Sequence, residues 1–111
     1  MVKYFLHLAS FLLLDSNAAM GQVNLIEHNI LIKNHYFQPS IIEISSNQKT
    51  RLTVCNNDDT VEEFESVDLK REKLVPSHSC VHIILAHLKP GKYNFVGEFH
   101  QDTANGYIIV K

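Results

Sequence analysis

Tryptophan is absent from this chain of 111 residues, and there are only two cysteines. The sequence contains no basic patch and its formal net charge is −2, so nothing in it indicates binding to nucleic acid. It also contains no low-complexity segment, no internal repeat and no long linker. With 45% hydrophobic residues, a chain of this length fits one small globular domain and leaves no room for a second.

Two further absences concern chemistry and secondary structure. No Ser/His/Asp or Cys/His constellation is present that would support hydrolysis or nucleophilic catalysis. No stretch has the apolar periodicity of a convincing amphipathic helix. The chain is therefore predicted to be built from strands and to lack a hydrolytic or nucleophilic site.

The N-terminus has the three-part pattern of a secretory signal peptide. A short basic segment, Met1–Lys3, precedes an almost unbroken apolar run, Tyr4–Leu14, and a small, polar segment, Asp15–Gly21. An apolar run of eleven residues is too short to span about 30 Å of hydrocarbon. We therefore expect cleavage rather than membrane anchoring, after Ala18 or after Gly21, both of which satisfy the small-x-small rule.

These features predict a signal peptide over residues 1–21, one domain over residues 22–111, and a periplasmic location without a membrane span after cleavage. No cysteine lies near the cleavage site, so a lipoprotein is not expected. The remaining chain of about 90 residues can fold alone, but only marginally without a cross-link.

Short apolar runs separated by turn residues follow one another along the rest of the chain. Strands are predicted at Asn29–Lys33, Ile41–Ile44, Thr50–Cys55, Glu62–Val67, Val81–Leu85, Tyr93–Phe95 and Gly106–Val110. The charged segment Leu69–Pro76 is predicted to be irregular. About seven short strands with turns between them predict an all-β sandwich with Greek-key connections.

Cys55 ends one predicted strand, and Cys80 precedes another. If these strands are antiparallel neighbours, the two sulfur atoms come within bonding range. An oxidising compartment permits a disulfide, while two unpaired thiols or a metal role stay open as alternatives. His78 and His82 flank Cys80, but no partner motif elsewhere in the chain supports a zinc site there.

Three motifs make the chain resemble a cupredoxin over essentially all of residues 22–111. They are the Phe37-x-Pro39 break, the Leu52-Thr-Val-x-Asn56 strand, and the Leu88-x-Pro-Gly-x-Tyr-x-Phe95 turn and strand. In blue-copper cupredoxins the Tyr-x-Phe strand leads into a copper-binding Cys, a His three residues later and then a Met. Here Gly97 stands in the place of the Cys, His100 in that of the His, and Thr103 or Ala104 near that of the Met.

Because this chain has no thiolate at that position, neither an ordinary blue-copper electron-transfer site nor an intense blue colour is expected. Cys55 and Cys80 lie at the wrong positions to replace the missing Cys. The other His of blue-copper sites comes a few residues after the Asn that ends the third strand. In this chain Asn56 is followed instead by Glu62-Glu-Phe-Glu65.

The chain is more specifically similar to small periplasmic cupredoxin-like proteins that are associated with bacterial ferrous-iron permease systems. The shared motifs are Glu63-Phe-Glu-Ser66, Leu69, Glu72-Lys73, Gly97-Glu-Phe-His100 and Thr103-Ala-x-Gly106. This resemblance implies a role in high-affinity iron uptake, with iron-permease or other periplasmic iron-transport components as partners. It also implies that the domain binds copper and iron and helps to oxidise Fe2+.

The predicted metal ligands are Glu63, Glu65, Glu98 and His100, with Glu72 and Asp102 as additional candidates. On a strand, Glu63 and Glu65 point to one side, and Phe64 points to the other side, where it can fill the core. Carboxylates placed this close together repel each other and invite a cation. Oxygen donors with an imidazole suit iron or Cu(II) better than Cu(I), which prefers sulfur.

Each candidate also has a simpler interpretation. Paired glutamates on an edge strand usually form a solvated face that discourages aggregation. Glu98 alone is more often a surface charge, and a lone loop histidine such as His100 is common. The acidic run from Asp58 to Asp68 could attract metal cations, or it could confer solubility, which is the favoured interpretation for Asp58 and Asp59.

Two functional alternatives stand beside an accessory of iron uptake. The first is a non-enzymatic copper carrier that hands ions to a periplasmic partner. The second is a structural or interaction β-sandwich that binds no metal. Oxidation of Fe2+ is the one enzymatic activity among these hypotheses.

Overall fold

Alternation of apolar and polar residues produces a structure built from strands. The computed structural model describes residues 25–111, and these residues form nine strands and no helix. The strands are β1 (Leu25–Lys33), β2 (Tyr36–Gln38), β3 (Ile41–Ile44), β4 (Lys49–Asn56), β5 (Glu62–Ser66), β6 (Arg71–Val75), β7 (Cys80–Leu85), β8 (Gly91–Gly97) and β9 (Asn105–Val110). The predicted signal peptide, 1–21, and the predicted domain start at residue 22 lie outside the described residues. Within residues 25–111, no helix is long and apolar enough to cross a membrane.

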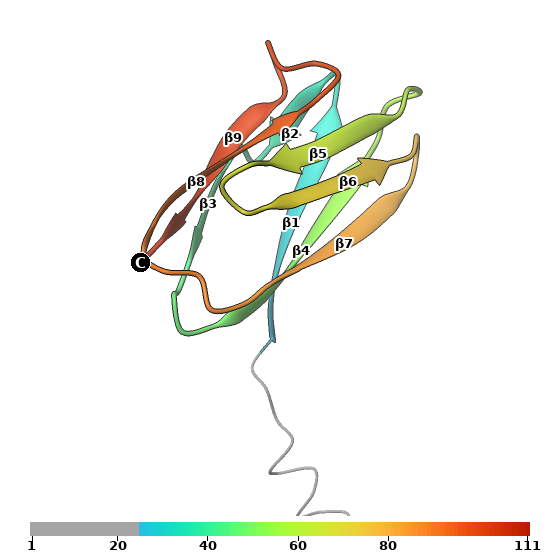
Figure 1. Ribbon diagram of the computed structural model, residues 1–111. Coiled ribbons are helices and arrows are strands. Elements are labelled where there is room, and N and C mark those ends of the chain that lie inside the picture. Colours follow the sequence, from blue (N-terminus) through green and yellow to red (C-terminus); the bar gives the residue numbers. More distant parts are fainter. Residues whose placement is uncertain (1–24) are drawn as a thin grey trace, which may run out of the picture.

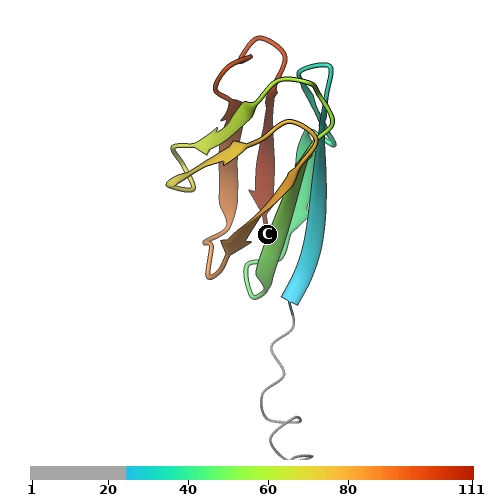
Figure 2. The same ribbon diagram turned by 90° about the vertical axis from the view of Figure 1, so that its right-hand side faces the viewer.

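The strands form two sheets that pack face to face, as the ribbon in Figure 1 and the edge-on view in Figure 2 show. One sheet has four strands in the order β2-β1-β4-β7, and the other has five in the order β3-β9-β8-β5-β6. β1 pairs with β4, and β3 with β9, in parallel, whereas the other pairs are antiparallel. The predicted all-β sandwich is confirmed, with nine strands in residues 25–111 rather than about seven.

The sequence patterns do not predict β2 and β6. β6 is an edge strand whose first four residues are exposed, so that only Val75 reaches the core. The expectation that Leu69–Pro76 is irregular is therefore wrong. Edge strands often carry charge because their outer edge contacts water, and such a strand looks like a loop in the sequence. β2 has only three residues, of which Phe37 alone is buried.

The inward-facing side chains of both sheets form one hydrophobic core. Leu52 and Val54 of β4 lie on the same face, as predicted, and both are fully buried. Phe64 of β5 is also fully buried, and its ring centroid lies 6.2 Å from that of Phe37 and 5.2 Å from that of Phe95. Aromatic rings at these separations attract one another beyond the effect of the area that they bury. This packing fixes β2, β5 and β8, which lead into the candidate site.

β4 and β7 are antiparallel neighbours, and Cys55 is directly opposite Cys80. The two residues form a disulfide in this structure, so neither thiol is free. The cross-link joins the end of β4 to the start of β7.

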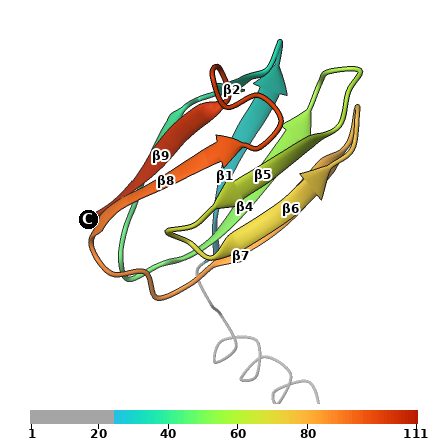
Figure 3. The same ribbon diagram turned by 45° about the horizontal axis from the view of Figure 1, so that its top comes forward.

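Three connections meet at one end of the sandwich, which comes forward in Figure 3. They are the β1–β2 turn, the β4–β5 loop and the β8–β9 loop. The N–H of Asn57 in the β4–β5 loop donates to the carbonyl of Ile32 at 2.8 Å. The hydroxyl of Thr103 in the β8–β9 loop donates to the carbonyl of His35 in the β1–β2 turn. Segments that are distant in sequence are therefore hydrogen-bonded to each other at this end of the sandwich. Loops held by a rigid scaffold in this way often carry the binding residues of a protein.

Candidate metal centre

Glu62 is a buried acidic residue at the start of β5. Inward-facing and outward-facing residues alternate along this strand, so Glu62 points into the sandwich while Glu63 and Glu65 point outward. Only 2% of Glu62 is exposed. Its carboxylate accepts the backbone N–H groups of Glu63 and Phe99, both at 2.9 Å, and lies 2.7 Å from Nδ1 of His100. These contacts compensate for the loss of water around a buried carboxylate, which is otherwise strongly unfavourable.

Gly97 at the end of β8 leaves room for this carboxylate. A Cβ atom at position 97 would lie 2.8 Å from Cδ of Glu62, 2.9 Å from its Oε2, and 2.7 Å from Cβ of Ala104. Contacts this short are not tolerated in a close-packed interior without movement of the neighbours. Gly97 stands where the blue-copper proteins that this chain resembles carry Cys. Part of the space that a side chain would need there is therefore occupied by the carboxylate of Glu62.

The β8–β9 loop directs the ring of His100 toward Glu62. The loop is closed at its base because the N–H of Gly97 donates to the carbonyl of Ala104 at 2.8 Å. Within the loop, the N–H of Ala104 donates to the carbonyl of His100 at 2.7 Å. The side chain of His100 is 31% exposed, whereas that of Glu62 is only 2% exposed. The imidazole thus lies between the buried carboxylate and solvent.

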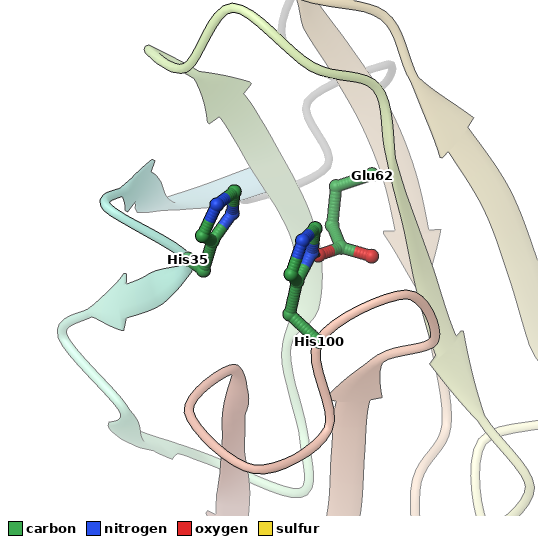
Figure 4. A group of neighbouring side chains, drawn as sticks. All are labelled: His35, Glu62 and His100. Atoms are coloured by element: carbon green, nitrogen blue, oxygen red, sulfur yellow. The ribbon is translucent and has the colours of Figure 1, made fainter.

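His35 completes the group from the β1–β2 turn. Asn34 and His35 both have left-handed backbone angles, with φ of 52° and 65°, and these angles reverse the chain direction. The ring of His35 stacks on that of His100, with centroids 3.6 Å apart and planes 10° from parallel. Figure 4 shows His100 between His35 on one side and Glu62 on the other.

The donor atoms of His35, Glu62 and His100 lie within 4.8 Å of one another, and among residues 25–111 no other group of three or more His, Cys, Asp or Glu residues has its donor atoms this close together. Two imidazoles and a carboxylate suit Cu(II), zinc or non-haem iron, whereas Cu(I) prefers sulfur. At metal–ligand distances of about 2.0–2.2 Å, two ligands at a right angle lie about 3 Å apart. The 2.7 Å between Nδ1 of His100 and Oε2 of Glu62 would need to open only slightly. The donor set therefore fits a divalent metal ion.

Four acidic residues form a separate group on the outward-facing side of β5; Glu63, Glu65, Glu72 and Glu98 are called the acidic cluster below. Glu65 is paired directly with Glu72 across β5 and β6, and the N–H of Glu98 donates to the carbonyl of Glu63 at 2.9 Å. A hydrogen bond with Glu98, then desolvation and the nearby negative charges, raise the pKa of Glu65 to about 7. Desolvation, followed by the charges of Glu72 and Glu98, raises the pKa of Glu63. These carboxylates therefore repel one another, as like charges in close proximity do.

The structure brings the predicted ligands of the acidic cluster together but does not join them to His100. The ring of His100 is hydrogen-bonded to Glu62 on the inner side of β5. Asp102 is exposed in the β8–β9 loop. Among residues 25–111, no group of ligand atoms within 4.8 Å combines the acidic cluster with His100. The predicted site of Glu63, Glu65, Glu98 and His100 therefore stays a prediction.

Neither His35 nor Glu62 is among the ligands predicted from the sequence. Glu62 carries a usable signal, because it lies a few residues after Asn56, where blue-copper proteins have their first His. Its inward direction also follows from the burial of Phe64, two residues later on the same strand. His35 lies in a turn and belongs to no motif, so only the three-dimensional structure identifies it.

The residues around Cys80 have other partners. Cys80 is part of the disulfide. Nε2 of His78 lies 2.7 Å from Oδ1 of Asp59, and Nδ1 of His82 lies 2.9 Å from the hydroxyl of Thr53. These contacts give no support to a zinc site with a Cys ligand.

The chain resembles known proteins in sequence over most of its length. Residues 4–110 match the cupredoxin-like domain family. The uncharacterized protein RP394 of Rickettsia prowazekii (strain Madrid E) is 58% identical over 87 residues, which are 78% of this chain and 70% of that protein.

Solved structures share the fold at much lower identity. Auracyanin A, a "blue" copper protein of Chloroflexus aurantiacus, has a TM-score of 0.68 at 12% identity over 79% of this chain and 100% of that one. The metal-binding domain of the Cu(I)-exporting P-type ATPase CopA of Streptococcus pneumoniae has a TM-score of 0.66 at 11% identity, over 82% of this chain and 99% of that one. At these identities the similarity concerns the fold alone. The match over residues 4–110, together with the two-sheet structure, shows that this chain belongs to the cupredoxin-like domain family.

Proposed function

We propose that this protein is a periplasmic metal-binding protein that holds a copper or iron ion between His35, Glu62 and His100. The observation that supports this proposal is the convergence of three donor side chains to within 4.8 Å at one end of the sandwich. Two of the three side chains are partly open to solvent, so an ion could reach them.

Each residue has a distinct part in this site. Oε1 of Glu62 is held by the N–H groups of Glu63 and Phe99, which leaves Oε2 directed at His100. Hydrogen bonds of this kind orient a ligand before the metal arrives. The ring of His35 is parallel to that of His100, so it must turn for one of its nitrogens to face the same ion. Its side chain is 40% exposed, which leaves space for that turn.

Copper is favoured by affinity. Sites with nitrogen and oxygen ligands generally bind Cu(II) more tightly than the other divalent first-row metals. Because neither a thiolate nor a thioether belongs to the group, the site prefers Cu(II) to Cu(I). When bound here, copper would supply a one-electron acceptor at the end of the sandwich. A carrier that hands copper to a periplasmic partner would use the same residues.

Iron is the second candidate, and the donor set gives it separate support. Two histidines and one carboxylate with open positions are the ligand set of many non-haem Fe(II) proteins. The acidic cluster lies on the other side of β5, and its charge would raise the local concentration of Fe2+. On this basis the protein would be an accessory of ferrous-iron uptake that passes iron to permease components. Oxygen ligands also favour Fe3+ over Fe2+, which would assist oxidation if copper or a partner accepts the electron.

Calorimetric titration of the folded protein with Cu2+, and anaerobically with Fe2+, tests the proposal. Glu62→Gln and His100→Gln should each weaken binding at least about tenfold, because even residues that only support ligands have effects of this size. Glu63→Gln is the matched control, because its side chain lies on the outer face of the same strand. It should bind like the wild type. A loss in Glu63→Gln but not in Glu62→Gln would place the ion in the acidic cluster instead.

Two further results separate the functional alternatives. Binding no tighter than about 0.1 mM for either metal would favour a structural module without metal. Stopped-flow oxidation of Fe2+, with and without copper, distinguishes the rest. A rate that depends on Glu62 and His100 would support iron oxidation, and copper binding without any such rate would support a carrier.

A further inference from the structure

The turn that carries His35 depends on an acidic side chain from another loop. Asn34 and His35 both adopt left-handed backbone angles, which are uncommon for residues other than glycine. The N–H of Asn34 donates to Oδ1 of Asp58 at 2.7 Å, and the N–H of His35 donates to Oδ2 at 3.0 Å. Nδ1 of His35 also lies 3.5 Å from Oδ2. One carboxylate therefore caps both unusual residues of the turn.

Asp58 is itself held in place. Its N–H donates to Oδ1 of Asn56 at 2.9 Å, and its carbonyl accepts the hydroxyl of Ser77 at 2.7 Å. Asn56 is only 2% exposed, and its amide group donates to the carbonyls of Thr60 at 2.8 Å and Val75 at 3.0 Å. Satisfied networks of this kind are rigid.

The burial of Asp58 does not fit the interpretation of this residue as a solubilising charge. Its side chain is 12% exposed, whereas that of Asp59 is 96% exposed. Hydrogen bonds from His35 and Asn34 and the charges of His35 and His100 more than offset the effect of desolvation, and they lower the pKa of Asp58. The side chain of Asp59 pairs with that of an exposed histidine, His78. Asp58 therefore belongs to a hydrogen-bond network inside the protein, whereas Asp59 is a surface charge.

From these contacts we propose that Asp58 is a positioning residue. It holds His35 next to His100, so that the ring of His35 can serve as the second imidazole of the metal site. The proposal rests on the function proposed above. The hydroxyl of Thr103 donates to the carbonyl of His35 and so connects the turn to the loop of His100. His35 is thus held through its N–H by one loop and through its carbonyl by another. Residues that orient a ligand in this way typically change metal affinity about 10- to 100-fold when they are replaced.

Asp58→Asn tests this role, with Asp59→Asn as the matched control. In the metal-free protein, NMR hydrogen exchange should show faster exchange of the Asn34 and His35 amides in Asp58→Asn and unchanged exchange in Asp59→Asn. After addition of Cu2+, the affinity of Asp58→Asn should fall at least about tenfold. Its electron paramagnetic resonance spectrum should lose the coupling of one nitrogen nucleus. Circular dichroism and Asp58→Ala, as a second variant, confirm that the loss is local.

Three outcomes would overturn the proposal, and they differ in what else they affect. If the wild type binds copper and Asp58→Asn shows the same affinity and nitrogen coupling, only the positioning role fails. If Asp59→Asn loses as much affinity as Asp58→Asn, the effect is one of charge alone, and the positioning role again fails. If the wild type binds neither Cu2+ nor, anaerobically, Fe2+, the proposed function fails together with this inference.

Discussion

The carboxylate of Glu62 fills the space that a side chain at Gly97 would need, because a Cβ atom there would lie 2.8 Å from Cδ of Glu62. A side chain at position 97 would therefore require the carboxylate of Glu62, together with Ala104, to move. By the motif resemblance, Gly97 stands where blue-copper proteins carry their Cys. This chain uses the same space for a buried oxygen donor beside His100.

Replacement of Gly97 by Ala should destabilise the protein by about 1–3 kcal/mol, the usual cost of inserting an atom into a packed interior. Urea unfolding measures this loss. In a Glu62→Ala background the penalty should be smaller, although the contact with Ala104 remains. An equal penalty in both backgrounds would contradict the predicted clash between a side chain at position 97 and the carboxylate of Glu62.

The acidic cluster should make the stability of the folded protein fall as the pH rises. The pKa of Glu65 is raised from 4.5 to about 7, so the folded protein binds more protons than the unfolded chain between these values. The stabilising effect of this group is complete below pH 4.5 and is lost as the pH rises through about 7. Glu65→Gln should therefore have a higher Tm than the wild type near pH 8 and a similar Tm near pH 4. Glu43→Gln, on β3, is the control. If the Tm difference between Glu65→Gln and the wild type is the same at both pH values, the prediction is wrong.

Reduction of the disulfide should lower stability without abolishing the fold. Cys55 and Cys80 are 25 residues apart, and the loop-entropy description gives about 3.5 kcal/mol for a cross-link of this span. Urea unfolding with and without a reductant should show this difference, and a Cys55→Ser, Cys80→Ser double variant should be insensitive to reductant. An unfolding midpoint unaffected by reductant in the wild type would be inconsistent with a stabilising cross-link.

The copper-loaded protein should absorb only weakly in the visible range. The chain has two cysteines, and both are in the disulfide, so no thiolate is available to transfer charge to copper. Absorption spectra at increasing Cu2+ measure this directly. An intense blue band would mean that a sulfur atom binds the ion.

Much of the fold can be predicted from the sequence because strand alternation is a local property. Leu52, Val54 and Phe64 are buried as their spacing indicates, and Cys55 lies opposite Cys80 as the strand order suggests. β6 escapes prediction, because an edge strand with one buried residue lacks the alternating pattern. Its partner β5 supplies the sheet contacts that the local sequence does not reveal.

The candidate site is less predictable, because its parts come from a turn, a loop and the start of a strand that are far apart in the sequence. Alternation correctly places Glu63 and Glu65 on the same side of β5, and their charges lead to the prediction of metal ligands on that side. The convergent donors lie on the other side, where Glu62 shares the inner face with Phe64. His35 depends on a turn whose geometry is set by Asp58, 23 residues later in the chain, and no local pattern contains that information.

A structure of the protein loaded with Cu2+ tests the central claim most directly. We predict that the ion lies about 2.0–2.2 Å from a nitrogen of His100, an oxygen of Glu62 and a nitrogen of a turned His35 ring. An ion held by the acidic cluster, with Nδ1 of His100 still 2.7 Å from Glu62, would contradict this account.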